Sequence, residues 1–106
     1  RGNRYDGIIM DPPSYGRGPN GEVWKLEQNL AELLGSVGQI LSEDAEFFML
    51  NSYTGGLSPT ILNYMVKNYV IKNRNGVVKT DEIGLKVTNK DIVLPCGNTT
   101  YWTKDR

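Results

Sequence analysis

The sequence predicts an α/β fold in which a parallel strand–helix unit comes first and an antiparallel hairpin follows. Two apolar runs of strand length alternate with two segments of helical periodicity. The last third of the chain holds two more strand-like runs, which a polar turn joins. With 106 residues the chain is short enough for a single domain over residues 1–106. We therefore expect about four strands and two main helices in one layered unit.

The first strand is expected over residues 5–10, because the continuous apolar run at residues 8–10 is typical of a strand buried on both faces. Pro12 and Pro13 follow this run. Their missing N–H groups and fixed φ exclude both ladder hydrogen bonds and helix at that point. The glycine-rich residues 16–21 are then expected to form a loop.

The first helix is expected over residues 23–41, where apolar side chains recur on one face at helical spacing. These side chains are Leu26, Leu30, Leu33, Leu34, Val37 and Leu41. Gly35 and Gly38 weaken the second half of the helix without overturning the prediction. At its start, Trp24 and Leu26 are expected to pin the preceding loop to the core.

A second strand is expected over residues 45–50, with a turn over residues 54–56. Ser58 and Pro59 then predict the start of a second helix, because serine is a favoured N-cap and proline suits the first helical position. The polar cluster at residues 73–76 ends that helix.

Two strands are expected to complete the chain, over residues 77–87 and 92–102, with residues 88–91 as the hairpin turn. Asp81 marks a candidate interruption of the first of these strands. Residues 95–98 mark a candidate interruption of the second.

Composition excludes several classes of function. The 12 basic and 12 acidic residues leave no overall basic footprint for nucleic acid, so any such contact must be local or supplied by another part of the protein. One cysteine excludes an internal disulfide, and the absence of histidine removes the commonest metal ligand and general base. No apolar run is long enough to span a membrane, and no signal peptide opens the chain, so a cytoplasmic protein is expected.

Polar and aromatic residues follow both of the first two strands. Right-handed crossovers place the ends of these strands side by side, about 5 Å apart, and ligands of open α/β sheets bind beyond such ends. The sequence therefore predicts a binding site at this edge of the sheet. Its candidate members are Asp11, Pro12, Pro13, Ser14, Tyr15, Asn51, Ser52 and Tyr53.

The stretch DPPSYGRGPNGEVWKLE, together with MLNSYTGGLSP and EIGL later in the chain, resembles one known family. Residues 11–15 look like the (Asp/Asn)-Pro-Pro-(Tyr/Phe) motif IV of class I S-adenosylmethionine (SAM)-dependent methyltransferases, with Ser14 inserted before the aromatic residue. The longer stretch is similar to the bacterial large-subunit ribosomal RNA methyltransferases. The resemblance covers nearly the whole chain and implies the C-terminal part of a Rossmann-like methyltransferase fold.

The resemblance also implies roles for these residues. In family members that methylate exocyclic amines, the acid and the first proline carbonyl accept hydrogen bonds from the target amino group, and the aromatic ring stacks on the base. Asp11, Pro12 and Tyr15 match these catalytic positions, although Tyr15 could instead pack under the loop. Related corners occur in enzymes that methylate base carbons, so the methylated atom stays open. The substrate-binding candidates are Pro13, Ser14, Arg17, Asn51, Ser52 and Tyr53.

Two further candidates have simpler alternatives. Arg17 could contact a phosphate or be a solvated loop charge. Cys96 could be a nucleophile, because C5 methylation of pyrimidines uses a cysteine thiolate that attacks C6, but a lone cysteine is more often a small buried residue.

The resemblance implies that SAM binds mainly on a glycine-rich loop and a strand-end acid that have no counterpart here. We therefore expect the substrate-side portion of a longer methyltransferase, which binds SAM weakly when alone and meets ribosomal RNA as part of the full-length protein. The lack of an initiator methionine fits this expectation, although engineered processing gives the same appearance.

Two other functions remain open. The first is a non-enzymatic module for RNA contact or dimerisation, in which a second copy covers the unpaired edge of the strand at residues 5–10. The second is a different α/β enzyme, such as a phosphoester-binding protein, that shares this corner.

Overall fold

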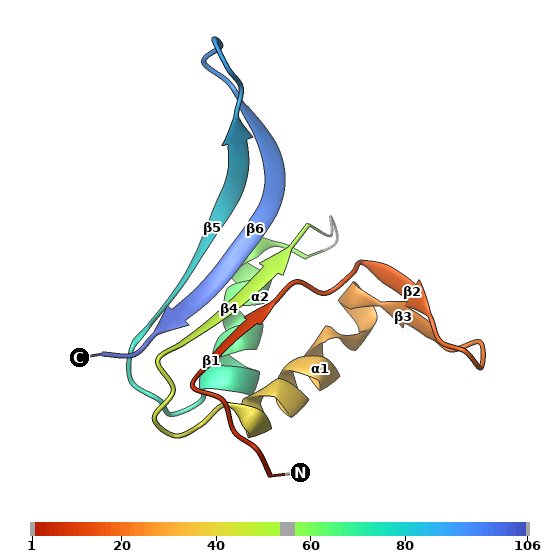
Figure 1. The fold of residues 1–106 in the computed structure, drawn as a ribbon, viewed down its shortest axis with the longest axis vertical. Coiled ribbons are helices and arrows are strands. Elements are labelled where there is room, and N and C mark those ends of the chain that lie inside the picture. Colours follow the sequence, from red (N-terminus) through yellow and green to blue (C-terminus); the bar gives the residue numbers. More distant parts are fainter. Residues whose placement is uncertain (1, 54–56, 106) are drawn as a thin grey trace.

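The computed structural model describes residues 2–53 and 57–105, so the turn expected over residues 54–56 lies outside the described residues. The elements follow the order strand, hairpin, helix, strand, helix, hairpin (Figure 1). Their bounds are β1 Gly7–Met10, β2 Tyr15–Arg17, β3 Val23–Lys25, α1 Leu26–Ile40, β4 Phe47–Ser52, α2 Pro59–Val66, the π-helix η1 Lys67–Ile71, β5 Val77–Lys86 and β6 Val93–Thr103.

The central sheet has four strands in the order β1-β4-β6-β5. β1 and β4 are parallel, whereas β6 runs antiparallel to both β4 and β5. The structure thus confirms the predicted α/β fold, with its parallel pair followed by an antiparallel hairpin. Among the described residues, β1 forms one edge of this sheet and β5 the other.

Both helices pack on one face of the sheet. Phe48 and Leu50 of β4, with Trp102 of β6, are buried there in one cluster with leucines of α1 and α2. Ile8 and Met10 of β1 pack against the same cluster. Because side chains alternate along a strand, the residues between them point to the opposite face.

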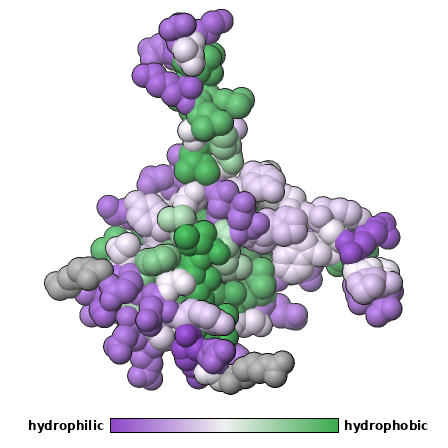
Figure 2. All heavy atoms as spheres, viewed as in Figure 1, coloured by the Kyte–Doolittle hydropathy of each residue, from purple (hydrophilic) through white to green (hydrophobic). Residues whose placement is uncertain are grey.

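That opposite face is open, and this corrects one expectation. The continuous apolar run of β1 predicted burial on both faces, but Ile9 is 68% exposed and Phe47, on neighbouring β4, is 37% exposed. No helix among the described residues covers these side chains. Figure 2 shows hydrophobic side chains over the middle of the molecule and along the protruding β5–β6 hairpin.

The structure places a short hairpin where the sequence predicted only a loop. β2 and β3 pair antiparallel, with Tyr15 opposite Lys25 and Arg17 opposite Val23. Helix α1 therefore begins at Leu26, three residues later than expected. The first helical turn predicted at residues 23–25 is extended because those residues pair with β2.

The second helix begins as predicted. Ser58 is its N-cap, with the hydroxyl accepting a hydrogen bond from the Ile61 N–H at 3.2 Å, and Pro59 is its first residue. η1 continues it to Ile71. Arg74 then donates hydrogen bonds to the carbonyl oxygens of Leu41 and Ser42, which ties the turn after η1 to the end of α1.

The last two strands lie within one residue of their expected bounds, and both are continuous. β5 runs through Asp81 without a break. β6 passes the expected interruption by a β-bulge, since Ile83 pairs with Gly97 and the next residue, Gly84, pairs with Pro95. Cys96 is the extra residue of this bulge. Beyond β4 the two strands continue as a free arm, which Figure 1 shows projecting from the body.

The two projecting hairpins make the molecule extended for its length. Its Cα radius of gyration is 15.2 Å, whereas a close-packed chain of this size is expected near 13 Å. Neither helix in the described part of the chain has the length and apolar content that crossing a bilayer requires.

Candidate functional site

The two predicted corners meet at the carboxyl ends of β1 and β4. Met10 pairs with Leu50, so Asp11 lies beside Asn51 on the open face of the sheet. The Asn51 side-chain nitrogen, Nδ2, donates a hydrogen bond to Asp11 Oδ1 at 3.3 Å. The adjacency that right-handed crossover predicted is therefore present.

A residue of a third strand, β6, supports the hydrogen bond between Asn51 and Asp11. Thr99 is the residue opposite Asn51 in the β4–β6 register. Its hydroxyl donates to Asn51 Oδ1 at 3.0 Å. Hydrogen bonds thus link Thr99, Asn51 and Asp11 across three neighbouring strands, a connection that the sequence did not suggest.

The β2–β3 hairpin fixes the proline corner. The indole nitrogen of Trp24 donates to the Pro13 carbonyl oxygen at 2.8 Å, and the Leu26 N–H donates to the Ser14 carbonyl oxygen at 3.0 Å. Leu26 is fully buried and Trp24 packs against the core, so these residues pin the preceding segment as predicted. Within residues 2–53 and 57–105, no hydrogen bond to the carbonyl oxygen of Pro12 is found.

The corner therefore holds two acceptors that no hydrogen bond among the described residues reaches, one oxygen of Asp11 and the carbonyl of Pro12. Asp11 itself is exposed, and its Oδ1 is engaged with Asn51. Two acceptors with no donor bound to them in the described part of the chain suit a ligand group that carries hydrogen, such as an amine. Because proline fixes φ, the Pro12 carbonyl is held in place before any ligand arrives.

Tyr15 and Arg17 lie on the same side of β2, since they are two residues apart in a strand. The Tyr15 side chain is 53% exposed. About half of the side chain is therefore open to solvent, and its role in stacking stays a prediction. Arg17 is also exposed, and its role as a phosphate contact stays a prediction.

Ser52 and Tyr53, both predicted to line the site after the second strand, differ in their exposure to solvent. β4 extends to Ser52, so alternation points Ser52 to the helix-covered face, where it is 1% exposed. Ser52 therefore lies in the core and does not line the predicted site. Tyr53 is 58% exposed at the end of the strand.

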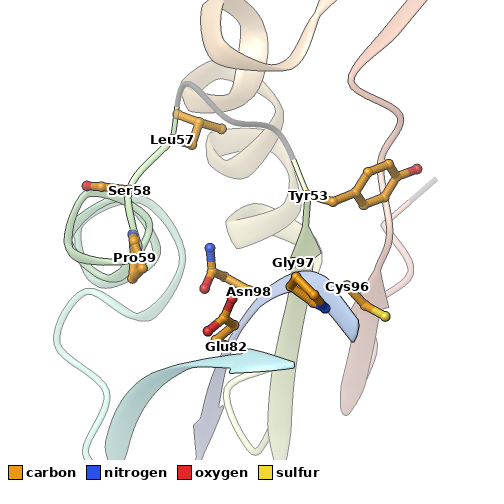
Figure 3. Close-up of a pocket in the computed structure, with 9 residues that line it drawn as sticks. Tyr53, Leu57, Ser58, Pro59, Glu82, Cys96, Gly97 and Asn98 are labelled. Atoms are coloured by element: carbon orange, nitrogen blue, oxygen red, sulfur yellow. The ribbon is translucent and has the colours of Figure 1, made fainter. Parts of the chain in front are cut away.

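A cavity of about 590 Å³ lies between the end of β4, the start of α2 and the β5–β6 hairpin, and Asp11 is not among the residues that line it. Figure 3 shows Glu82 and Asn98 between β4 and the start of α2, with the Tyr53 ring and the Cys96 thiol turned to the other side. Asn98 and Glu82 are neighbours across β6 and β5. Tyr53 and Cys96 are the members of the predicted site that border this cavity.

Cys96 occupies the bulge of β6. Its thiol donates to the Leu94 carbonyl oxygen at 3.4 Å, and the side chain is partly exposed. Gly97, the next residue, has a φ of 116°, and a side chain there would overlap the Ser52 carbonyl oxygen. The bulge thus brings Cys96 close to the end of β4, while its role as a nucleophile stays a prediction.

Comparison with solved structures identifies the fold. The chain matches the SAM-dependent methyltransferase from Agrobacterium tumefaciens with a TM-score of 0.86 and 29% identity, over 98% of this chain and 34% of that one. It also matches SMU.776, assigned as a methyltransferase and crystallised with SAH, with a TM-score of 0.65 and 17% identity, over 95% of this chain and 27% of that one.

No model of a known protein family and no curated protein matches the sequence. The chain spans about a third of the length of the Agrobacterium protein. Within that span the match runs through the parallel pair, both helices and the final hairpin, since it leaves only 2% of this chain uncovered. The chain therefore has the fold of the matching third of a class I SAM-dependent methyltransferase.

Proposed function

We propose that this chain holds the methyl acceptor in a SAM-dependent methyltransferase that acts on a base in ribosomal RNA. The observation that carries the proposal is the structural match over 98% of the chain to a SAM-dependent methyltransferase. The position of the Asp11 corner supports it, because ligands of open α/β sheets bind at the carboxyl ends of the strands.

The corner supplies the groups that an amino acceptor needs. Asp11 and the Pro12 carbonyl accept hydrogen bonds from the acceptor and orient its lone pair toward the methyl donor. The Tyr15 ring, 53% exposed, lies against the base, a contact worth about 1–3 kcal/mol. Asp11 also offers a carboxylate oxygen that can take up the proton which an amine loses on methylation.

SAM is the cofactor of the proposal, and it supplies an activated methyl group when bound. The chain represents 34% of the length of the Agrobacterium neighbour. We infer that SAM is held mainly by a part of the protein other than these 106 residues. The proposal places the protein in the cytoplasm, with ribosomal RNA as its partner.

A non-enzymatic role is the less favoured alternative, because the neighbour at 29% identity is a methyltransferase.

Arg17, exposed on β2, is the residue proposed to contact an RNA phosphate beside the acceptor. Cys96 is kept as a candidate nucleophile only for methylation of a base carbon.

Titration with radiolabelled SAM tests the proposal. We compare the SAM affinity of the 106-residue chain with that of a second protein, here called the lengthened protein. The lengthened protein is the same chain extended at its N-terminus by the residues that its reading frame encodes there. The chain alone is expected to bind SAM weakly and the lengthened protein to bind it and label RNA. A lengthened, folded protein that binds no SAM would contradict the proposal.

A further inference from the structure

The hydrogen bonds that reach Asp11 begin at a residue of β6, the third strand of the sheet counted from the β1 edge. Thr99 of β6 donates to Asn51 Oδ1 at 3.0 Å, and Asn51 Nδ2 donates to Asp11 Oδ1 at 3.3 Å. The second contact is long for a hydrogen bond, so by itself it holds the carboxylate weakly.

The chemistry of the carboxylate, the amide and the hydroxyl fixes which group donates in each of these two hydrogen bonds. An ionised carboxylate only accepts hydrogen bonds, so the amide nitrogen of Asn51 must face Asp11. The amide oxygen then faces Thr99, whose hydroxyl is free to donate. Loss of that hydroxyl leaves Asn51 Oδ1 without a donor and allows the amide to rotate away from Asp11.

The orientation of the Asn51 amide depends on the hydrogen bond from Thr99. Asn51 is half-buried near the end of the β4–β6 pairing, and its hydrogen-bond partners among the described side chains are Thr99 and Asp11. Asp81 of β5 is the residue across from Thr99 on the other side. Its exposed side chain lies on the same face of the sheet, while the Thr99 hydroxyl donates to Asn51 Oδ1.

We infer that Thr99 is a positioning residue for the acceptor site. Its hydroxyl fixes the Asn51 amide, which engages one oxygen of Asp11 and leaves the other oxygen for the hydrogen of the methyl acceptor. The inference rests on the proposed function for its consequence in methyl transfer, but the positioning itself is measurable without activity.

The test uses three variants of residues on β6. Thr99→Val removes the hydroxyl and keeps the β-branched shape that suits a strand. Thr99→Ser keeps the hydroxyl. Thr103→Val removes an exposed hydroxyl from the same side of the same strand, four residues further on, and serves as the matched control.

The first readout is the NMR signal of the Asn51 side-chain amide and of the Asp11 carboxyl carbon in the 106-residue chain. Thr99→Val is expected to shift both signals, whereas Thr99→Ser and Thr103→Val leave them at their wild-type positions. Backbone amide signals away from the site report that the fold is kept. Unchanged Asn51 and Asp11 signals in folded Thr99→Val would overturn the inference.

The second readout is methyl transfer by the lengthened protein. Thr99→Val is expected to lower kcat/KM about fivefold to tenfold, the effect of one hydrogen bond, with SAM affinity unchanged and with recovery in Thr99→Ser. Wild-type rates in Thr99→Val would overturn the catalytic part of the inference. If the wild-type protein itself transfers no methyl group, the proposed function fails, and the NMR comparison still decides the positioning.

Discussion

The Trp24 side chain connects the proline corner to the helix that follows it. Its indole nitrogen donates to the Pro13 carbonyl oxygen at 2.8 Å, while its ring packs against the core. This one side chain thus fixes the backbone beside Asp11 and Pro12. A rigid backbone matters here because an acceptor carbonyl contributes most when it is held before the substrate binds.

Replacing Trp24 by phenylalanine is expected to remove that hydrogen bond while keeping an aromatic ring. We expect a loss of about 1 kcal/mol in the free energy of unfolding, the typical net value of one hydrogen bond. Urea unfolding, followed by the fluorescence of Trp102, measures it, since the sequence contains 2 tryptophans. Trp102 is 1% exposed and reports on the core.

The comparison variant is Trp102→Phe, followed through Trp24. Trp102 also donates its indole N–H to a carbonyl oxygen, that of Asn75 at 2.9 Å, but from inside the core. It should therefore lose packing as well as a hydrogen bond and be destabilised more than Trp24→Phe. Equal stability of Trp24→Phe and the wild type would show that the indole does not hold the corner.

At the residue scale, the sequence predicted Asp11 and Asn51 correctly as neighbours, because two parallel strands must end at one edge. It could not predict that Ser52 is buried. Asn51 and Ser52 were expected beyond the strand, whereas β4 continues to Ser52, so the two side chains alternate to opposite faces. Thr99 was missed because its partner is set by register between distant strands, which local pattern does not reveal.

Helix α1 packs closely against η1, and its two internal glycines differ in what surrounds them. A side chain at Gly38 would overlap the Tyr69 carbonyl oxygen, whereas one at Gly35 would meet no atom within 4 Å. Gly38 therefore permits the close approach of the two helical segments. At Gly35 no such close approach requires a glycine.

The two alanine variants are expected to change stability in opposite directions. Gly35→Ala should raise the free energy of unfolding by about 0.5–1 kcal/mol, because alanine restricts the unfolded chain and favours helix. Gly38→Ala should lower it, because the backbone of η1 must move. Thermal and urea unfolding of both variants measure this pair. Stabilisation by Gly38→Ala would contradict the close packing of α1 on η1.

At the element scale, periodicity predicted both helices and the strands of the central sheet, but not the β2–β3 hairpin. Residues 23–25 directly precede the apolar stripe of α1, so the helix was expected to include them. The glycines between the two short strands are typical of a loop. Val23 and Lys25 are extended because they pair with Arg17 and Tyr15 across this loop. Similarly, Pro95 predicted a break in β6, whereas a bulge at Cys96 keeps the strand continuous.

Among the described residues, one face of the sheet is open and β1 and β5 form its two edges. β1 is the edge strand on the side of the parallel pair, and its Ile9 side chain is 68% exposed. An edge strand with apolar side chains is a template for pairing with another chain. We therefore predict that the 106-residue chain self-associates through β1 when it is isolated.

Replacing Ile9 by lysine is expected to reduce this association, because a charge on an edge strand discourages strand addition. Sedimentation velocity over a range of concentrations measures the fraction of dimer. Val93→Lys adds the same charge on the arm, where the side chain is 59% exposed, and should leave association unchanged. A wild-type chain that stays monomeric at all concentrations would refute a dimer through this edge.

The account depends most on residues 11–15 holding the methyl acceptor. Asp11→Ala removes the carboxylate, whereas Asp11→Asn keeps one side-chain acceptor oxygen. Asp6→Ala, at the other end of β1, removes a carboxylate that accepts a hydrogen bond from the Ser42 hydroxyl at 2.6 Å and is the control.

The decisive measurement is transfer of a labelled methyl group from SAM to RNA by these variants of the lengthened protein. We predict that Asp11→Ala lowers the rate about 100-fold with SAM affinity unchanged, the cost of an acceptor that is no longer aligned. Asp11→Asn should keep part of the activity and Asp6→Ala nearly all of it. Equal rates for Asp11→Ala and the wild-type protein would contradict the account.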